Sequence, residues 1–300
     1  MRQLFLAFLF FLIPLGIFAQ DDLMNILNQD SSRVTNFTTA TFKSTRIMDG
    51  HSIESMPPGQ LDVRISHRFG TLNSGGYNFW GLDQSNIHLG LEYGIFKWLM
   101  IGIGRGSYEK TFDGFTKFTL LKQSSGEKVM PFSVSLFSSV ALKSLKWTDQ
   151  TRTNYFSSRL SYVGQILIAR KISEGLSIQL TPSYVHRNLV ATELDPNDLF
   201  ALGAGARLKL TKRISLNAEY YYLINPTNNM TPQIYNPLSV GVDIETGGHV
   251  FQLFFSNSVG TIEKQFIGET TGQWKKGDIH FGFNISRVFT LKKHQNTPGY

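Results

Sequence analysis

The sequence contains no cysteine in 300 residues and only 10 prolines. The absence of cysteine excludes a disulfide framework, a cysteine-ligated metal and a lipidated N-terminal cysteine. Charged residues make up 17% of the chain and the mean hydropathy is -0.11, which excludes a bundle of membrane helices. Hydrophobic residues, at 41%, exclude a disordered chain. The 24 Phe, 11 Tyr and 27 Gly residues favour strands and tight turns.

The first twenty residues have the pattern of a secretory signal peptide. Met1 and Arg2 precede an apolar stretch at 4–18, and Ala19 stands before a polar sequence that includes Asp21. We expect cleavage after Ala19, which makes residues 1–19 the signal peptide. A membrane anchor is the alternative, but the apolar run is shorter than the roughly 18 to 20 residues that a spanning helix needs.

The mature chain is basic. Removing Arg2 leaves 28 of the 29 basic residues against 22 acidic ones, a net charge of +6. Such a balance suggests a nucleic-acid partner in a cytosolic protein, but secretion excludes that partner. No second stretch of 18 apolar residues occurs, so we expect no membrane helix. The chain is therefore either soluble or a closed barrel, because an open sheet leaves backbone groups unpaired in lipid.

Beyond Gln60, segments of about 9 to 13 residues alternate apolar with polar or small residues, and turn-rich pieces separate them. This period of two is typical of strands with one apolar face. The outward-facing apolar positions lie in twelve segments: 61–65, 87–93, 99–103, 116–120, 132–136, 160–168, 176–184, 202–208, 214–222, 238–244, 251–255 and 279–285.

The connections between these segments alternate in length. Short ones lie at 95–98, 123–129, 171–175, 211–213 and 246–248. Longer ones lie at 70–84, 107–113, 143–157, 187–199, 225–237 and 258–277. Outer-membrane barrels have short periplasmic turns, long external loops and an even strand number. We therefore predict an all-β fold, a single antiparallel transmembrane β-barrel of about 12 strands (range about 10 to 14) with both termini periplasmic.

A soluble β-sandwich or lipocalin-like barrel is the alternative fold. Aromatic residues near the strand ends argue against it, for example Trp98 at one rim and Trp147 and Tyr184 near the other. Such rings suit the two membrane interfaces. The last strand closes on Phe289, which looks like the assembly signal of outer-membrane barrels, although a tail at 290–300 follows it.

Three stretches resemble a known family: TFKSTRIMDGHSIE (41–54), ISHRFG (65–70) and FWGLDQSNIHLGLEYG (79–94). They are similar to an uncharacterised family of outer-membrane β-barrels from Bacteroidota, over most of the mature chain. This family has no assigned activity or substrate. The resemblance therefore implies a fold and a location in the bacterial outer membrane, and it supplies no functional residue.

The chain divides into four parts on this interpretation: the signal peptide (1–19), an N-terminal periplasmic or partly plugging segment (20–59), the barrel (60–289) and a periplasmic tail (290–300). Residues 34–48 alternate weakly and have no place in an even strand count. These residues therefore lie either in the periplasm or inside the barrel, where they would narrow the pore. Glycines on the lumen face, such as Gly205 and Gly282, indicate either tight curvature or the close approach of another backbone.

Polar residues fill the inward register and are the candidate pore-lining residues. They are Arg64, Arg68, His88, Glu92, Arg159, Arg207, Glu219, Asp243 and His280. Their mixed charges indicate either a salt-bridged, rigid interior or a functional constriction. Barrel closure brings His88 and His280 near Arg68, but two histidines without a carboxylate make a poor metal site. We therefore expect no metal and no cofactor.

No catalytic residues are predicted. Ser183 and His186 fall near the external rim, where some twelve-stranded barrels carry a lipid hydrolase, but their offset of three places them on opposite faces of a strand. A string of glycines at 102–106 lies on a strand with the wrong spacing for a dinucleotide site.

The sequence favours a narrow passive channel for small solutes, since about twelve strands enclose less space than an open porin. A non-conducting barrel that anchors a surface or periplasmic assembly is the alternative, and a lipid hydrolase is a third possibility. Membrane lipid is the expected partner, partly through basic residues such as Lys97, Lys212 and Arg213 at the periplasmic rim. A protein partner is not identified by any motif.

Overall fold

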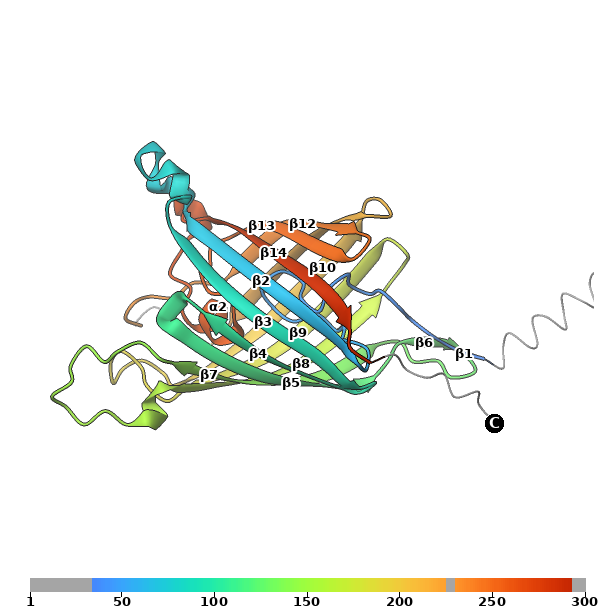
Figure 1. The fold of residues 1–300 in the computed structure, drawn as a ribbon, viewed down its shortest axis with the longest axis horizontal. Coiled ribbons are helices and arrows are strands. Elements are labelled where there is room, and N and C mark those ends of the chain that lie inside the picture. Colours follow the sequence, from blue (N-terminus) through green and yellow to red (C-terminus); the bar gives the residue numbers. More distant parts are fainter. Residues whose placement is uncertain (1–33, 225–229, 293–300) are drawn as a thin grey trace, which may run out of the picture.

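The computed structural model describes residues 34–224 and 230–292. The signal peptide expected at 1–19 lies outside these residues, as does most of the expected tail. Twelve antiparallel strands close into one barrel, in which the last strand pairs with the first (Figure 1). The predicted all-β, twelve-stranded antiparallel barrel is confirmed. Its strands are β2 (Gln60–Thr71), β3 (Ser85–Phe96), β4 (Leu99–Gly106), β5 (Thr111–Leu121), β7 (Ser133–Lys143), β8 (Leu160–Lys171), β9 (Leu176–Arg187), β10 (Asp198–Lys209), β11 (Ile214–Leu223), β12 (Leu238–Thr246), β13 (His249–Ser256) and β14 (His280–Thr290).

The remaining elements are short. Strand β1 (Thr35–Phe37) pairs with β6 (Ser124–Gly126) in a two-stranded sheet beside the barrel. The helical turns are η1 (Leu72–Ser74), η2 (Gly76–Gly81), η3 (Tyr108–Lys110), η4 (Phe156–Arg159), α2 (Glu263–Gly268) and η5 (Trp274–Lys276). Among the described residues, no helix has the length and apolar character that a membrane crossing requires.

The period of two in the sequence separates the two faces of each strand. In β3, Ile87, Leu89 and Leu91 are 41%, 52% and 44% exposed on the outside of the barrel. His88 and Glu92, one position away, are buried inside it. Because the backbone of a closed barrel pairs all of its own hydrogen-bonding groups, this apolar exterior can face acyl chains.

The two ends of the barrel differ. Short connections at 97–98 and 247–248 lie at the end where β2 begins and β14 ends, which we call the turn end. Long connections, including 144–159 and 257–279, lie at the opposite end, which we call the loop end (Figure 1). At the turn end, Trp98 stacks on Phe96 and Phe118 with ring centroids 5.3 and 6.1 Å apart, as in an interfacial aromatic girdle. The assignment of the turn end to the periplasm stays a prediction.

Substituting Leu89 with arginine tests the lipid-facing assignment. Leu89→Arg places a guanidinium on the apolar exterior of β3 and should lower the free energy of unfolding by about 2 to 4 kcal/mol. The control is Leu194→Arg, because Leu194 is 84% exposed in the connection between β9 and β10, outside the barrel wall. The control should change stability by about 0.5 kcal/mol or less. Urea unfolding in lipid vesicles measures both, and equal losses would contradict the assignment.

Candidate functional site

The lumen of the barrel holds a hairpin formed by residues 41–54, which we call the plug. Its two sides are joined by hydrogen bonds from Ile47 N to Gly50 O and from Ser52 N to Thr45 O, both 2.9 Å. Glu54 closes the base, because its Oε1 accepts hydrogen bonds from the N–H groups of Thr41 (2.7 Å) and Phe42 (3.3 Å). The chain enters from β1 and leaves to β2, so both ends of the plug emerge at the turn end.

Two arginines of β2 hold the plug from one side. Arg64 Nη2 donates to Ser44 Oγ (3.0 Å) and Thr45 Oγ1 (2.7 Å), and it also pairs with Asp62 on its own strand (2.7 Å). Arg68 Nη2 forms an ion pair with Asp49 Oδ1, at the plug tip, with a separation of 2.5 Å. All four charged groups in these contacts, Asp49, Asp62, Arg64 and Arg68, are almost completely buried.

Arg46 of the plug connects three parts of the molecule. Its Nη2 lies 3.4 Å from Glu92 Oε1 on β3, and its Nη1 lies 3.2 Å from Glu263 Oε1 on α2. Glu92 also accepts a hydrogen bond of 2.5 Å from Thr45 Oγ1. Arg46 therefore ties the plug both to the wall and to the connection between β13 and β14.

Side-chain amides of the wall satisfy the backbone of the plug. Gln252 donates to Ile47 O, Asn284 to Met48 O and Gln179 to His51 O, each at 2.8 Å. On β11, Glu219 Oε1 accepts hydrogen bonds from the N–H groups of Asp49 (3.0 Å) and Gly50 (2.8 Å). Buried backbone groups require such partners, and here side chains of the lumen supply what a sheet ladder supplies elsewhere.

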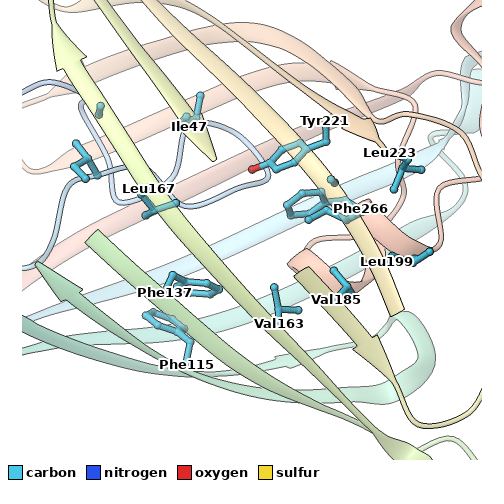
Figure 2. Close-up of a cluster of buried hydrophobic side chains, with 14 of the residues drawn as sticks. Ile47, Phe115, Phe137, Val163, Leu167, Val185, Leu199, Tyr221, Leu223 and Phe266 are labelled. Carbon is cyan, nitrogen blue, oxygen red and sulfur yellow. The ribbon is translucent and has the colours of Figure 1, made fainter. Parts of the chain in front are cut away.

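The lumen also contains an apolar cluster, which the sequence analysis did not predict. Figure 2 shows plug residue Ile47 and Phe266 of α2 among inward-facing side chains of the wall. The wall contributes Phe115, Phe137, Val163, Leu167, Val185, Leu199, Ala201, Tyr221 and Leu223, from strands β5 to β11. We call β11–β14 with β2 and β3 the polar half of the wall, because most of the charged groups and hydrogen bonds that hold the plug come from these strands. The other half carries most of the apolar cluster, although Gln179 on β9 also donates to the plug.

Glycines on the lumen face make room for neighbouring side chains. A Cβ atom added to Gly205 would lie 2.4 Å from Ile47 Cδ1, and one added to Gly282 would lie 2.8 Å from Arg68 Cδ. The sequence analysis offered tight curvature or the approach of another backbone, whereas the atoms that approach both glycines belong to side chains. At Gly205 the group that approaches belongs to the plug.

The connection between β13 and β14 closes the lumen at the loop end. Its helix α2 is buried, with Phe266 and Ile267 at 0% exposure. Lys264 Nζ lies 2.5 Å from Glu269 Oε1 and 2.6 Å from Glu109 Oε2 of η3. Burial lowers the pKa of Lys264, but Glu269 and Glu109 outweigh burial and raise this pKa above its usual value. Lys264 therefore stays charged and holds α2 in the mouth of the barrel.

Most predicted lumen residues gather around the plug. Arg64, Arg68, Glu92 and Glu219 contact the plug directly. Arg207 Nη1 donates to the carbonyl oxygen of Ala40 (3.2 Å), just before the plug, and to that of Thr41 (3.4 Å), its first residue. All five side chains are buried. Whether they line a conducting pore stays a prediction.

The two histidines have separate partners. His88 Nε2 lies 2.7 Å from Asp113 Oδ1, and His280 Nδ1 lies 2.8 Å from Phe69 O. Asp243 accepts a hydrogen bond of 3.0 Å from a glutamine of β13. Within residues 34–224 and 230–292, no group of three or more His, Asp or Glu side chains is arranged to hold a metal ion.

Arg159 is not in the barrel wall. It ends η4, one residue before β8 begins, and its Nη1 donates to the carbonyl oxygens of Lys143 (2.8 Å) and Leu145 (2.6 Å). Its guanidinium lies over the Trp147 ring, 4.3 Å from the centroid. The structure thus moves Arg159 from the lumen of the membrane-spanning strands to the loop end, because the helical turn breaks the alternation that the sequence suggested.

The family of the chain follows from its sequence as a whole. Residues 42–289 match the family model described as a membrane bound beta barrel domain, DUF5777. The chain belongs to this family. The matched region includes residues 42–54 of the plug as well as the barrel. A search of curated proteins finds no match.

Solved structures of outer-membrane proteins are similar in fold. The KdgM porin is 9% identical, with 78% of this chain and 99% of that chain covered and a TM-score of 0.45. Omp33 of Acinetobacter baumannii is 9% identical, with 77% and 98% covered and a TM-score of 0.42. Outer membrane phospholipase A from Escherichia coli is 11% identical, with 80% and 95% covered and a TM-score of 0.43.

The chain is an outer-membrane β-barrel. This conclusion follows from the closed antiparallel barrel, its apolar exterior and the membrane-bound family to which the chain belongs.

Removing the positive charge of Arg46 should loosen the plug. Arg46→Met leaves Glu92 and Glu263 buried without this partner, and breaking a buried pair in this way costs about 3 to 5 kcal/mol. The native chain has no cysteine, so Ser52→Cys, at a plug position with 0% exposure, gives a single label site. We expect Arg46→Met to raise the rate of maleimide labelling there by roughly tenfold or more.

The matched control is Lys43→Met. Lys43 pairs with Glu245 at a partly exposed site, where an ion pair contributes little. If the two substitutions accelerate labelling equally, Arg46 does not anchor the plug.

Proposed function

We propose that this protein is a narrow, gated channel for small solutes in the outer membrane, and that the plug closes it at rest. On this proposal the turn end faces the periplasm and the loop end faces the exterior. Solute passes when the plug leaves the polar half of the lumen.

The composition of the wall beneath the plug carries the proposal. Arg64, Glu92, Glu219, Gln252 and Asn284 point inward from five different strands, and each is at most 3% exposed. A wall that only supported a permanent core would gain more from apolar side chains, because replacing buried ion pairs by packed apolar groups is often neutral or stabilising. Polar side chains suit a wall that is at times in contact with water.

The path of the chain supports withdrawal of the plug. Residues 38–59 form one loop between the β1–β6 sheet and the start of β2, and this loop both enters and leaves the lumen through the turn end. The plug can therefore move toward this end without threading through the barrel or breaking a strand pair. Release would break hydrogen bonds, but water can replace them at a net cost of about 0.5 to 1.5 kcal/mol for each neutral bond and about 1.5 to 3 kcal/mol where one group is charged.

Unpaired polar atoms where the plug meets the wall also favour hydration of the lumen. Arg46 Nε, Arg64 Nη1 and Arg68 Nε are buried without a hydrogen-bond partner among the described residues. A buried, unsatisfied donor of a charged group destabilises the closed state by at least about 1 to 3 kcal/mol. Entry of water would remove this penalty and offset part of the cost of opening.

The lipid hydrolase is disfavoured by the geometry of its candidate pair. Ser183 is buried in the lumen and bonds to Gln165 and Thr181, whereas His186 pairs with Asp198 at 2.6 Å at a partly exposed position. Since the two side chains lie on opposite faces of β9, the histidine cannot activate this serine. This geometry supports a non-enzymatic barrel.

A reversible disulfide tests the gate. The hydroxyl oxygens of Ser55, beside the plug, and Thr119, on β5, are 3.4 Å apart, so Ser55→Cys with Thr119→Cys can form a bond that ties the plug to the wall. In planar bilayers we expect brief openings of the native protein. The oxidised double variant should give none, and addition of reductant should restore them.

Arg46→Met supplies the opposite arm of this experiment, since a loosened plug should lengthen the open time. A bilayer that stays silent with Arg46→Met and with the reduced double variant would reject the channel. That result would favour the non-conducting barrel that anchors an assembly.

A further inference from the structure

A second polar site lies at the loop end, outside the plug. It is a cavity of about 280 Å³ in the mouth of the barrel, between α2 and the connection from β7 to β8. Five basic residues line it, and Glu269 is the one carboxylate in its lining. The basic residues are Lys143, Lys146, Arg159, Arg187 and Lys264.

Two of the arginines are held by neutral groups. Arg187, at the end of β9, donates to Gly268 O (3.1 Å) and Pro196 O (2.8 Å). Arg159 donates to two carbonyl oxygens of the preceding connection and lies over the indole ring of Trp147. Among the described residues, neither guanidinium has a carboxylate within 4.0 Å. Neutral groups thus fix the positions of both guanidinium groups, and neither is in direct contact with a carboxylate of the described chain.

The acids nearby do not neutralise the cavity. Glu109 and Asp195 line an adjoining cavity of about 330 Å³, which shares Lys143, Arg187 and Glu269 with the first. Glu109 pairs with Lys143 and Lys264, and Glu269 pairs with Lys264. Lys264 and Lys143 outweigh burial and lower the pKa of Glu109. Five cations against three carboxylates leave an excess of two positive charges over the two cavities.

We propose that this cavity binds a small organic anion that carries two or more carboxylate or phosphate groups. An excess of two charges matches a dianion, and guanidinium groups bind carboxylate and phosphate oxygens in pairs. The inference extends the proposed function, because it names the class of solute that reaches the closed lumen from outside.

A free solute fits the location better than a lipid headgroup. Lys143, Ser161 and Arg187 occupy inward positions at the ends of their strands, and Lys264 lies on α2, inside the mouth. Lipid contacts the exterior of the barrel, so a headgroup would have to leave the bilayer to reach these side chains.

Calorimetric titration of the purified full-length protein in a non-ionic detergent tests the site, with citrate and inorganic phosphate as probes at low salt. We expect binding that weakens as salt rises, because screening reduces the attraction. The double variant Arg159→Gln/Arg187→Gln should weaken binding of citrate at least tenfold. Lys146→Gln, at an exposed lining position with no ion pair among the described residues, should weaken it severalfold without a risk to folding.

The matched control is Arg152→Gln, which removes the same charge from the same connection at an exposed position outside the cavity lining. Absence of binding for both probes would overturn the proposal, as would equal losses in the control and the double variant. Binding of vesicles containing phosphatidylglycerol, with none of citrate or phosphate, would also overturn it and identify a lipid site. Because the titration does not measure conduction, a silent channel that binds citrate would reject only the proposed function.

Discussion

Lipid cannot form hydrogen bonds with a polypeptide backbone, and the rest of this structure depends on that constraint. Strands that cross the bilayer must pair on both edges, so the twelve of them close into a ring. Closure then fixes the direction of every side chain, apolar residues outward and the alternate set inward. The inward set encloses a space that must hold either water or protein. In this chain the plug and α2 occupy it.

The plug is stabilised in two different ways. On the side of β2 and β3, buried arginines pair with carboxylates and hydroxyl groups, and each contact depends on geometry because a buried charge without a partner is costly. On the side of β7 to β10, Ile47 meets an apolar surface, which tolerates small displacements better than an ion pair does. The polar contacts therefore specify the position of the plug, while the apolar cluster contributes non-directional burial.

The sequence predicts the barrel well and its contents poorly. Alternation is a local property, so the strands and the faces of residues such as Leu89 and Glu92 can be assigned without knowledge of distant contacts. The position of residues 41–54 depends on contacts such as Arg68 with Asp49 and Asn284 with Met48, which join distant parts of the chain. One local signal was present: in β8, Ile166, Leu167 and Ile168 are apolar on both faces. A strand that is apolar toward the lumen indicates protein packed inside the barrel.

Helix α2 links the lumen to the outer cavity through two neighbouring residues. Glu263 points to Arg46 of the plug, and Lys264 points to Glu109 and Glu269 at the lining of the two outer cavities. The helix has only six residues, and Phe266 and Ile267 fix it in the interior with 0% exposure. One short buried segment therefore carries an ion pair to the plug on one side and ion pairs to the mouth of the barrel on the other.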